Sequence, residues 1–199
     1  MSTAQVVLPG DPIDPSLLST STTDLKLGPG LRYTPPSSIS ASVAGLLSSD
    51  ARKNAVWVEY AGGRYTPHVG DLVIATVVRG GGDFFTCAIT PYAATAALPI
   101  LAFEGANKKN RPQLQPGAVV YARVVSDGRH VEAELECVNQ RTGKGDGLGP
   151  LKGGMVFDVS TAFARRLMMG KRGGVVVLEV MSEKVGFEVA VGGNGRVWV

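Results

Sequence analysis

A basic loop carries the side chains best suited to bind a polyanion. Lys108, Lys109 and Arg111, with Asn110 among them, place three cations within four positions. Lysines and arginines at this density contact the phosphates of RNA without reading its sequence. A solvated surface loop has the same composition. We expect these four residues to contact RNA.

Aromatic side chains are a second feature that single-strand binding requires, because bases stack on their rings. Phe84, Phe85, Tyr92 and Tyr121 are the candidates in the middle of the chain. Adjacent strand residues point to opposite faces, so Phe84 and Phe85 cannot both face outward. We expect these aromatics to belong to the core. Arg79, which precedes a run of three glycines, is a weaker candidate for RNA contact.

Two glycine motifs could approach a nucleic-acid backbone closely. Gly170-Lys171-Arg172-Gly173 has the Gly-x-x-Gly pattern that clamps the RNA backbone when it lies between two helices, with basic Lys171 and Arg172 in the middle. A helix C-cap followed by a surface loop explains the same residues. Gly192-Gly193-Asn194-Gly195 has no helix after it, so it can form neither a clamp nor a phosphate cradle. We interpret Asn194-Gly195 as a tight hairpin turn with positive φ at both residues.

Three carboxylates at alternating positions could coordinate a divalent metal ion. Glu132, Glu134 and Glu136 alternate with apolar residues and therefore share one face of a strand. A hydrated face, or docking to a basic neighbour, explains this pattern better than a metal site.

Other residue types argue against catalysis. His68 and His130 are far apart in the sequence, and neither has a serine or cysteine partner that the sequence can pair with it. Cys87 and Cys137 have no nearby cysteine or histidine to complete a zinc site. We expect no catalytic residue, no metal, no cofactor and no enzymatic activity, and we expect reduced thiols in an intracellular protein.

Composition limits the remaining function classes. The formal net charge is +3, and residues 148–199 carry seven basic and four acidic side chains, so a polyanionic partner is permitted but not required. No leader-like start and no long apolar run occurs, which predicts a soluble protein without a membrane partner. Twenty-six glycines and twelve prolines favour several small modules made mainly of strands.

These residues are distributed over three predicted modules. Residues 1–63 have too little apolar material for a core of their own, so we expect an N-terminal β domain that docks on a partner or on the next domain. Residues 64–146 contain five strand-like runs, the number expected of an OB barrel. At the end of this part and the start of the next, GKGDGLGP at 143–150 is typical of a linker and lacks the glycine spacing of a phosphate-binding loop. Five runs define the barrel: 71–78, 84–89, 97–101, 118–125 and 131–138.

Residues 147–199 form a small mixed α/β, KH-like module. We expect a strand at 155–159, a helix at 161–169 capped by Ser160 and ended by Gly170, and two final strands joined by the terminal glycine turn. Residues 175–184 are ambiguous, because three valines favour a strand and the following residues favour a helix.

Three stretches carry a resemblance to a known family. Residues 102–112, 192–199 and 6–11 are similar to the eukaryotic RNA exosome cap subunits of the ribosomal RNA processing protein forty type, and the similarity covers nearly the whole chain. The resemblance implies an N-terminal domain, an OB domain of the S-one (S1) type and a KH domain. It also implies that Gly192, Asn194 and Gly195 form a structural turn at the boundary between the barrel and the KH domain.

The function implied by the resemblance is that of a non-catalytic scaffold. Such subunits sit on a ring of RNase PH-like proteins beside other cap subunits, and they guide single-stranded RNA into the central channel for 3′-to-5′ rRNA processing and RNA degradation. Hydrolysis belongs to associated ribonucleases, and the complex works in the nucleus, including the nucleolus, and in the cytoplasm. The alternatives are a free-standing RNA-binding adaptor with OB and KH modules, and a ribonuclease.

Overall fold

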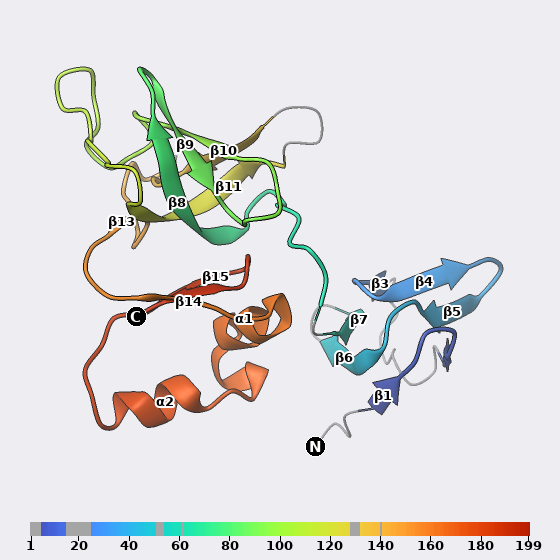
Figure 1. The fold of residues 1–199 in the computed structure, drawn as a ribbon. Coiled ribbons are helices and arrows are strands. Elements are labelled where there is room, and N and C mark those ends of the chain that lie inside the picture. The colour runs from blue at the N-terminus through green and yellow to red at the C-terminus, as the bar shows by residue number, and fades with distance from the viewer. Residues whose placement is uncertain (1–4, 15–24, 51–53, 61, 128–131, 140) are drawn as a thin grey trace. The chain divides into compact units, whose positions relative to one another are not determined.

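The computed structural model describes residues 5–14, 25–50, 54–60, 62–127, 132–139 and 141–199, without the side chains of 171 and 172. His130, and the start of the run expected at 131–138, lie outside these residues. The chain divides into two compact units, residues 1–62 and 63–199 (Figure 1). No helix in the described part is long and apolar enough to span a bilayer.

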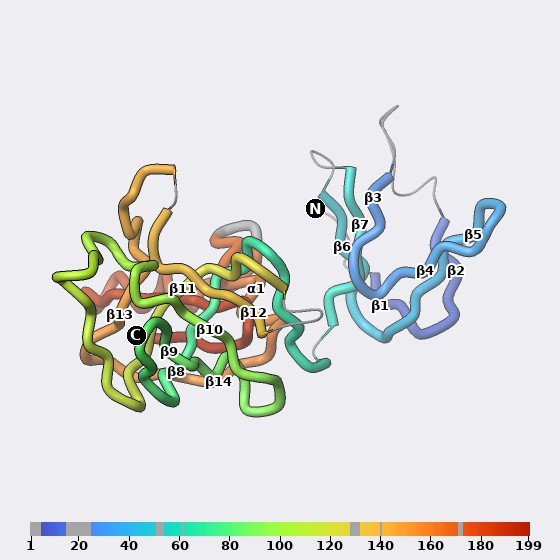
Figure 2. The backbone as a smooth tube through the Cα atoms, turned by 90° about the horizontal axis from the view of Figure 1, so that it is seen from above, coloured from blue at the N-terminus to red at the C-terminus, as the bar shows by residue number. Residues whose placement is uncertain are grey.

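The N-terminal unit consists of two small sheets that face each other (Figure 2). The first sheet has the order β1-β6-β7-β3, and the second has the order β2-β5-β4. Val7, Ile13, Ile39, Ala41 and Val58 are buried between them, so the expectation that this segment lacks a core of its own is wrong. The strands are β1 (Gln5–Val7), β2 (Pro12–Ile13), β3 (Lys26–Leu27), β4 (Leu31–Thr34), β5 (Ser38–Ala41), β6 (Gly45–Asp50) and β7 (Ala55–Glu59).

The second unit begins with a barrel. Its sheet has the order β12-β10-β9-β8-β11-β13, and an additional pairing of β12 with β11 closes it. The five runs expected from the sequence all form strands of this barrel. The strands are β8 (Leu72–Gly80), β9 (Phe84–Ala88), β10 (Ala96–Pro99), β11 (Val119–Ser126), β12 (Ala133–Glu136) and β13 (Gly149–Leu151).

The last of these strands corrects the linker interpretation. Residues Gly149–Leu151 pair with Val119–Tyr121 of β11 and extend the barrel sheet by one strand. Glycine and proline obscured this strand in the sequence, because both are depleted in strands. Here Pro150 lies in the outermost strand of the sheet, where no further strand needs its missing N–H.

The first part of strand β8 is buried on both faces, which explains the continuous apolar run at residues 72–75. Val73, Ala75 and Val77 point into the barrel core, whereas Ile74 packs against Ala190 and Trp198 of the C-terminal module. The alternation of side chains along a strand thus contributes to two cores at once.

The C-terminal module places two helices beside a sheet of order β14-β16-β15 (Figure 1). Ser160 caps α1 as expected, because its Oγ accepts a hydrogen bond from the N–H of Phe163 at 3.1 Å. The ambiguous residues 175–184 contain a helix, and the last-but-one strand begins at Ala190 rather than at Phe187. The elements are β14 (Val156–Asp158), α1 (Thr161–Met168), the 3-10 helix η2 (Gly170–Gly173), α2 (Val177–Ser182), β15 (Ala190–Gly192) and β16 (Arg196–Trp198).

The terminal hairpin differs from the expected two-residue turn. Gly192 pairs with Arg196, so three residues form the loop, and only Gly195 has a positive φ, of 79°. A type I turn followed by one left-handed residue is the usual geometry for a three-residue hairpin. Asn194 therefore does not adopt the left-handed conformation, and its side chain has another role.

Candidate nucleic-acid interface

The basic loop after β10 is held by an asparagine that precedes the cations. Oδ1 of Asn107 accepts hydrogen bonds from the N–H groups of Lys109, at 2.9 Å, and Asn110, at 2.7 Å. The Asn107 N–H in turn donates to the Asn110 carbonyl at 3.1 Å. This is an asparagine-stabilised turn. It leaves Lys108 and Lys109 exposed on the loop.

Arg111 connects this loop to the β8–β9 turn. Its guanidinium donates to the carbonyl of Gly82 at 3.0 Å and lies 4.0 Å from the carboxylate of the exposed Asp83. Two regions that are distant in the sequence thus lie together at one end of the barrel. Exposed ion pairs of this kind are weak, so a phosphate could compete for the guanidinium.

Arg79 and Phe84 share the outward face beside that turn. Arg79 is opposite Thr86 in the β8–β9 pairing, and Phe84 lies two residues before Thr86 on the same face. Residue Phe84 is 47% exposed, whereas its neighbour Phe85 is buried in the core. Cations and an exposed ring are thus adjacent, as single-strand binding requires.

The expectation that all four aromatics belong to the core is therefore wrong for two of them. Phe84 is half exposed, and Tyr92 is 76% exposed. Phe85 packs edge-on against Phe103, with 6.2 Å between the ring centroids. Tyr121 is half-buried, and its hydroxyl donates to the Val191 carbonyl at 3.1 Å.

The Gly170–Gly173 segment forms a short 3-10 helix between α1 and α2. Nε of Arg166 donates to the carbonyl of Gly173 at 2.8 Å, and a Cβ at Gly173 would lie 2.6 Å from the carbonyl carbon of Arg166. Packing against α1 thus explains why residue 173 is glycine. The backbone position is compatible with a clamp, and RNA contact by Lys171 and Arg172 stays a prediction.

The side chain of Asn194 joins the C-terminal hairpin to the barrel. Its Nδ2 donates to the carbonyls of Ile74, at 2.9 Å, and Ile89, at 2.7 Å, while its Oδ1 accepts from the Ile74 N–H at 3.2 Å. The Gly193 N–H adds a bond to the Leu72 carbonyl at 2.7 Å. Asn194 is buried, and its amide uses both its donor and its acceptor groups.

The residues on either side explain the rest of the motif. A Cβ at Gly192 would lie 2.7 Å from the Ile74 nitrogen, so a larger residue would displace the hairpin from β8. Arg196 donates to the Thr76 hydroxyl at 2.8 Å and lies 3.4 Å from Asp158. The glycine motif therefore fixes the C-terminal module against the barrel.

The carboxylates around β12 do not form one hydrated face. Glu136 is buried and pairs with Arg123 at 3.6 Å, whereas Glu134 is exposed. Glu132 accepts a hydrogen bond from the Thr95 hydroxyl at 2.8 Å. Among the described residues, no group of acidic, histidine or cysteine side chains could hold a metal ion.

The two thiols are buried in the barrel core. Burial raises the pKa of both Cys87 and Cys137 to about 12, so the neutral thiol predominates at physiological pH. Reactive cysteines have lowered pKa values and some exposure. The observed environment is that of structural cysteines.

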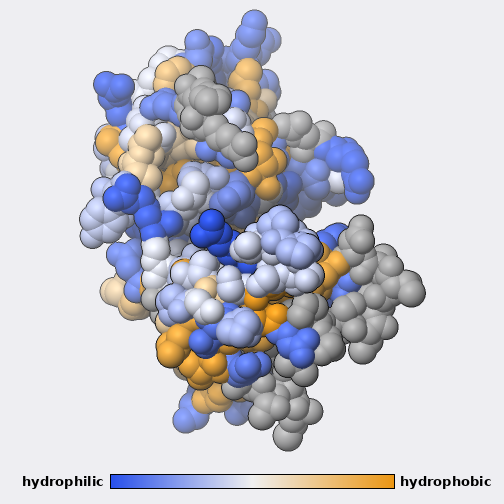
Figure 3. Space-filling view, turned by 90° about the vertical axis from the view of Figure 1, so that its right-hand side faces the viewer, coloured by the Kyte–Doolittle hydropathy of each residue, from blue (hydrophilic) through white to orange (hydrophobic). Residues whose placement is uncertain are grey.

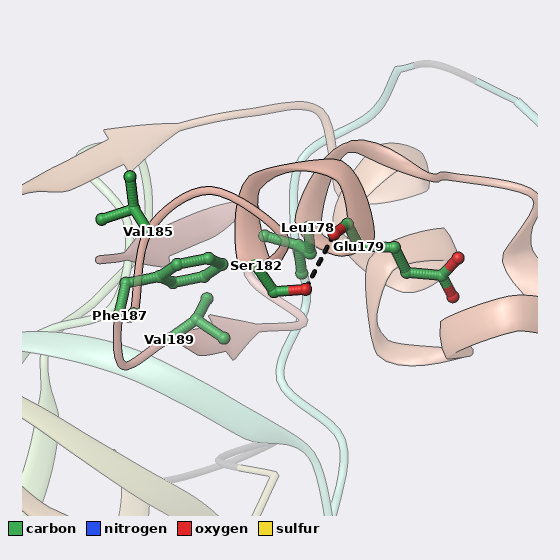
Figure 4. A pocket seen from close by; sticks show the side chains of 7 residues that line it. Leu178, Glu179, Ser182, Val185, Phe187 and Val189 are labelled. Carbon is green, nitrogen blue, oxygen red and sulfur yellow. Dashed lines mark hydrogen bonds between the residues drawn. The ribbon is translucent and has the colours of Figure 1, made fainter.

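A pocket of about 390 Å³ lies between α2 and the segment that leads into β15. Its lining includes Leu178, Val185, Phe187 and Val189, and the carboxylate of Glu179 points away from these apolar side chains (Figure 4). Within this lining, no nucleophile is paired with a base.

The OB barrel, the helical Gly-x-x-Gly segment and the cations beside an exposed ring define a class of protein with linked OB and KH modules. Family comparisons agree with this class. Residues 25–64 match the exosome complex exonuclease Rrp40 N-terminal domain, residues 65–149 match the exosome complex component RRP40 S1 domain, and residues 154–199 match a KH domain.

Similarity to individual proteins identifies the family more specifically than the domain matches do. The chain is 38% identical to exosome complex component RRP40 of Saccharomyces cerevisiae, over 97% of this chain and 80% of the relative, and 37% identical to that of Drosophila melanogaster, over 100% and 82%. A crystal structure described as that of an exosome complex RNA-binding protein aligns with a TM-score of 0.53 at 25% identity, covering 68% of this chain and 75% of the other. The chain belongs to the RRP40 family of exosome complex components.

Proposed function

We propose that this chain is a non-catalytic cap subunit of an RNA exosome. It stabilises a ring of RNase PH-like proteins and helps guide RNA into the central channel for 3′-to-5′ processing and degradation. The observation that carries the proposal is that one chain matches the Rrp40 N-terminal, S1 and KH domains in order, with relatives named RRP40 over nearly its whole length.

The basic end of the barrel is the proposed RNA contact. Lys108, Lys109 and Arg111 supply phosphate contacts together with Asn110, and Arg79 lies on the same face as the exposed Phe84 ring. A base can stack on that ring without sequence readout. Lys171 and Arg172 form a second proposed contact in the KH module.

The partners follow from the same assignment. The chain contacts RNase PH-like ring subunits and the other cap subunits, and it acts on single-stranded RNA that associated ribonucleases degrade. The proposed locations are the nucleus, including the nucleolus, and the cytoplasm. The chain itself contributes no catalytic residue, metal or cofactor.

RNA capture by the reconstituted complex tests the proposed contact. Replacing Lys108, Lys109 and Arg111 with alanine removes three phosphate partners, so affinity should fall and the dependence of log Kd on log salt should flatten by about two to three units of slope. Fluorescence anisotropy with a labelled single-stranded RNA over a salt series measures both quantities.

A matched control is the double replacement of Lys152 and Lys184 with alanine, which removes cations from other parts of the second unit. The control complex should keep the salt slope of the unmodified complex. An unchanged slope in the triple variant would remove the basic loop from the RNA path.

A further inference from the structure

The tetrapeptide Arg-Tyr-Thr-Pro occurs twice in the chain, at residues 32–35 and 64–67. A third threonine that precedes a proline is Thr90, and no serine precedes a proline. Proline-directed protein kinases phosphorylate a threonine followed by proline, a residue with a fixed φ and no backbone N–H. Because the first two sites share four residues, their structural surroundings can be compared directly.

The first of these sites is exposed along its whole length. Thr34 ends strand β4, and every residue from 32 to 38 is exposed. Tyr33, beside the threonine, is 51% exposed. The β4–β5 hairpin lies at the right of Figure 1, on the side that faces the viewer in Figure 3, where hydrophilic residues (blue to white) cover much of the nearest surface. A kinase can therefore reach both the hydroxyl group and the proline.

The backbone of β4 also suits an enzyme that binds an extended segment. In the described part of the chain, β4 is the outermost strand of the sheet β2-β5-β4, so one edge of its backbone has no strand partner there. A proline restricts the preceding residue to extended conformations, and Thr34 is extended within β4. An extended segment with a free edge can pair with another protein by strand addition.

A cation lies beside the threonine on the same face of the hairpin. In the β4–β5 pairing, Arg32 is opposite Ser40 and Thr34 is opposite Ser38, so these polar side chains share one face. A phosphate on Thr34 carries roughly two negative charges at neutral pH. The Arg32 guanidinium is suited to pair with it, because its fork of donors matches the phosphate oxygens. Phosphorylation thus changes the charge of this face from positive to negative.

The other two sites are less accessible. In the second tetrapeptide, Tyr65 packs against the barrel core and its hydroxyl donates to the Asp71 carboxylate at 2.8 Å, and Pro67 is half-buried. Thr90 is half-buried as well, and its Oγ1 accepts a hydrogen bond from the Tyr92 N–H at 3.4 Å. A kinase would have to detach either segment from the barrel before it could bind.

We propose that Thr34 is a phosphorylation site for a proline-directed serine/threonine kinase. The Thr34 Oγ attacks the γ-phosphorus of a nucleoside triphosphate held by the kinase, and the bond from that phosphorus to the bridging oxygen breaks. A nucleoside diphosphate leaves, and the hydroxyl proton passes to the catalytic carboxylate of the kinase. The site is independent of the proposed RNA contact, and it makes the charge of the β4–β5 hairpin depend on kinase activity.

The test follows all three threonines in the full chain. The chain is incubated with ATP and a purified cyclin-dependent kinase or, separately, a mitogen-activated protein kinase, both of which are proline-directed. Mass spectrometry of the phosphopeptides gives the rate at each site. At least one kinase should modify Thr34 about tenfold faster than Thr66 or Thr90, because opening a packed segment costs free energy.

Three variants identify the site. Thr34→Ala should remove most of the incorporated phosphate, whereas the matched control Thr66→Ala should leave it nearly unchanged. Pro35→Ala should slow modification of Thr34 about tenfold, because it restores a backbone N–H where the kinase requires none. Positions 34 and 35 are exposed, so the melting temperatures of these variants should equal that of the unmodified chain.

Three results would overturn the proposal. Neither kinase could modify Thr34, or Thr66 or Thr90 could be modified as fast as Thr34, which would show that exposure does not select the site. The rate at Thr34 could also be unchanged in Pro35→Ala, which would show that the proline is not recognised.

Discussion

The side chain of Asn194 holds the terminal hairpin against the barrel. Its amide pairs with both the N–H and the carbonyl of Ile74, as a peptide group in a neighbouring strand would, and it also reaches the carbonyl of Ile89. An aspartate in its place could accept but not donate, and would face two carbonyl oxygens. The terminal hairpin thus depends on asparagine itself rather than on any small polar residue.

The substitution Asn194→Ala should destabilise the second unit strongly. It leaves the Ile74 N–H and the Ile89 carbonyl without their Asn194 partner, and it leaves the Ile74 carbonyl with only the Arg196 guanidinium at 3.3 Å. The free energy of unfolding should fall by about 3 kcal/mol. Urea denaturation followed by tryptophan fluorescence measures this, because Trp198 packs at the same boundary. Asn110→Ala, at an exposed position, should change the free energy by less than about 0.5 kcal/mol. Equal effects of the two substitutions would contradict the structural role of Asn194.

At this scale, the sequence predicted the turn but not its geometry. Asn-Gly favours a hairpin through local backbone preference, and the hairpin between β15 and β16 is present. The bonding partner of Asn194 lies 120 residues away in the chain, and no local pattern encodes it. Gly192 could have indicated the contact with β8, because a glycine within a strand often marks a place where another backbone approaches closely.

Among the elements, strands with alternating or continuous apolar sequence were predictable, and short edge strands were not. Strands β8 and β11 follow from their runs of valine, isoleucine and alanine. Strand β13 has the sequence Gly-Pro-Leu and exists because β11 supplies the partner for its backbone. Helix α2 was ambiguous for a related reason: its valines have no buried contacts that would favour either state.

The barrel core should make the fold sensitive to alkali. Burial raises the pKa of Cys87 and Cys137 to about 12 from the usual 9.0 of a thiol. Between these values the unfolded chain loses thiol protons that the folded chain keeps, so the free energy of unfolding is unaffected below about pH 9 and falls as the pH rises toward 12. Burial also raises the pKa of the Tyr121 phenol.

A pH series of denaturation curves from pH 7 to 11 tests the thiol contribution. The double variant Cys87→Ala and Cys137→Ala should be less stable at pH 7, because it loses packing, but its stability should decline less steeply above pH 9. A decline of equal slope in both proteins would show that the thiols are not responsible.

At the scale of the molecule, each of the two units has a core of its own. The second unit presents cations and the exposed Phe84 at one end of a barrel, to which the KH module is fixed by Asn194. The first unit buries its apolar residues between two small sheets.

The family could be inferred from the sequence because its motifs lie in every module, in order. The basic loop and the terminal hairpin are continuous in sequence and therefore visible as patterns. The outward face shared by Arg79 and Phe84 is not, because these residues become neighbours only through the pairing of β8 with β9. Phe84 was misjudged for a similar reason, since strand alternation alone does not say which of two adjacent rings faces the core.

Native assembly is the measurement that tests the central claim most directly. The chain, tagged and expressed at its natural level, should co-purify with a complete set of RNase PH-like subunits in equal stoichiometry and elute at the size of that particle, as determined by quantitative mass spectrometry of the gel-filtration peak. Elution of the chain without the ring, alone or bound only to RNA, would contradict the account and identify a free-standing adaptor instead.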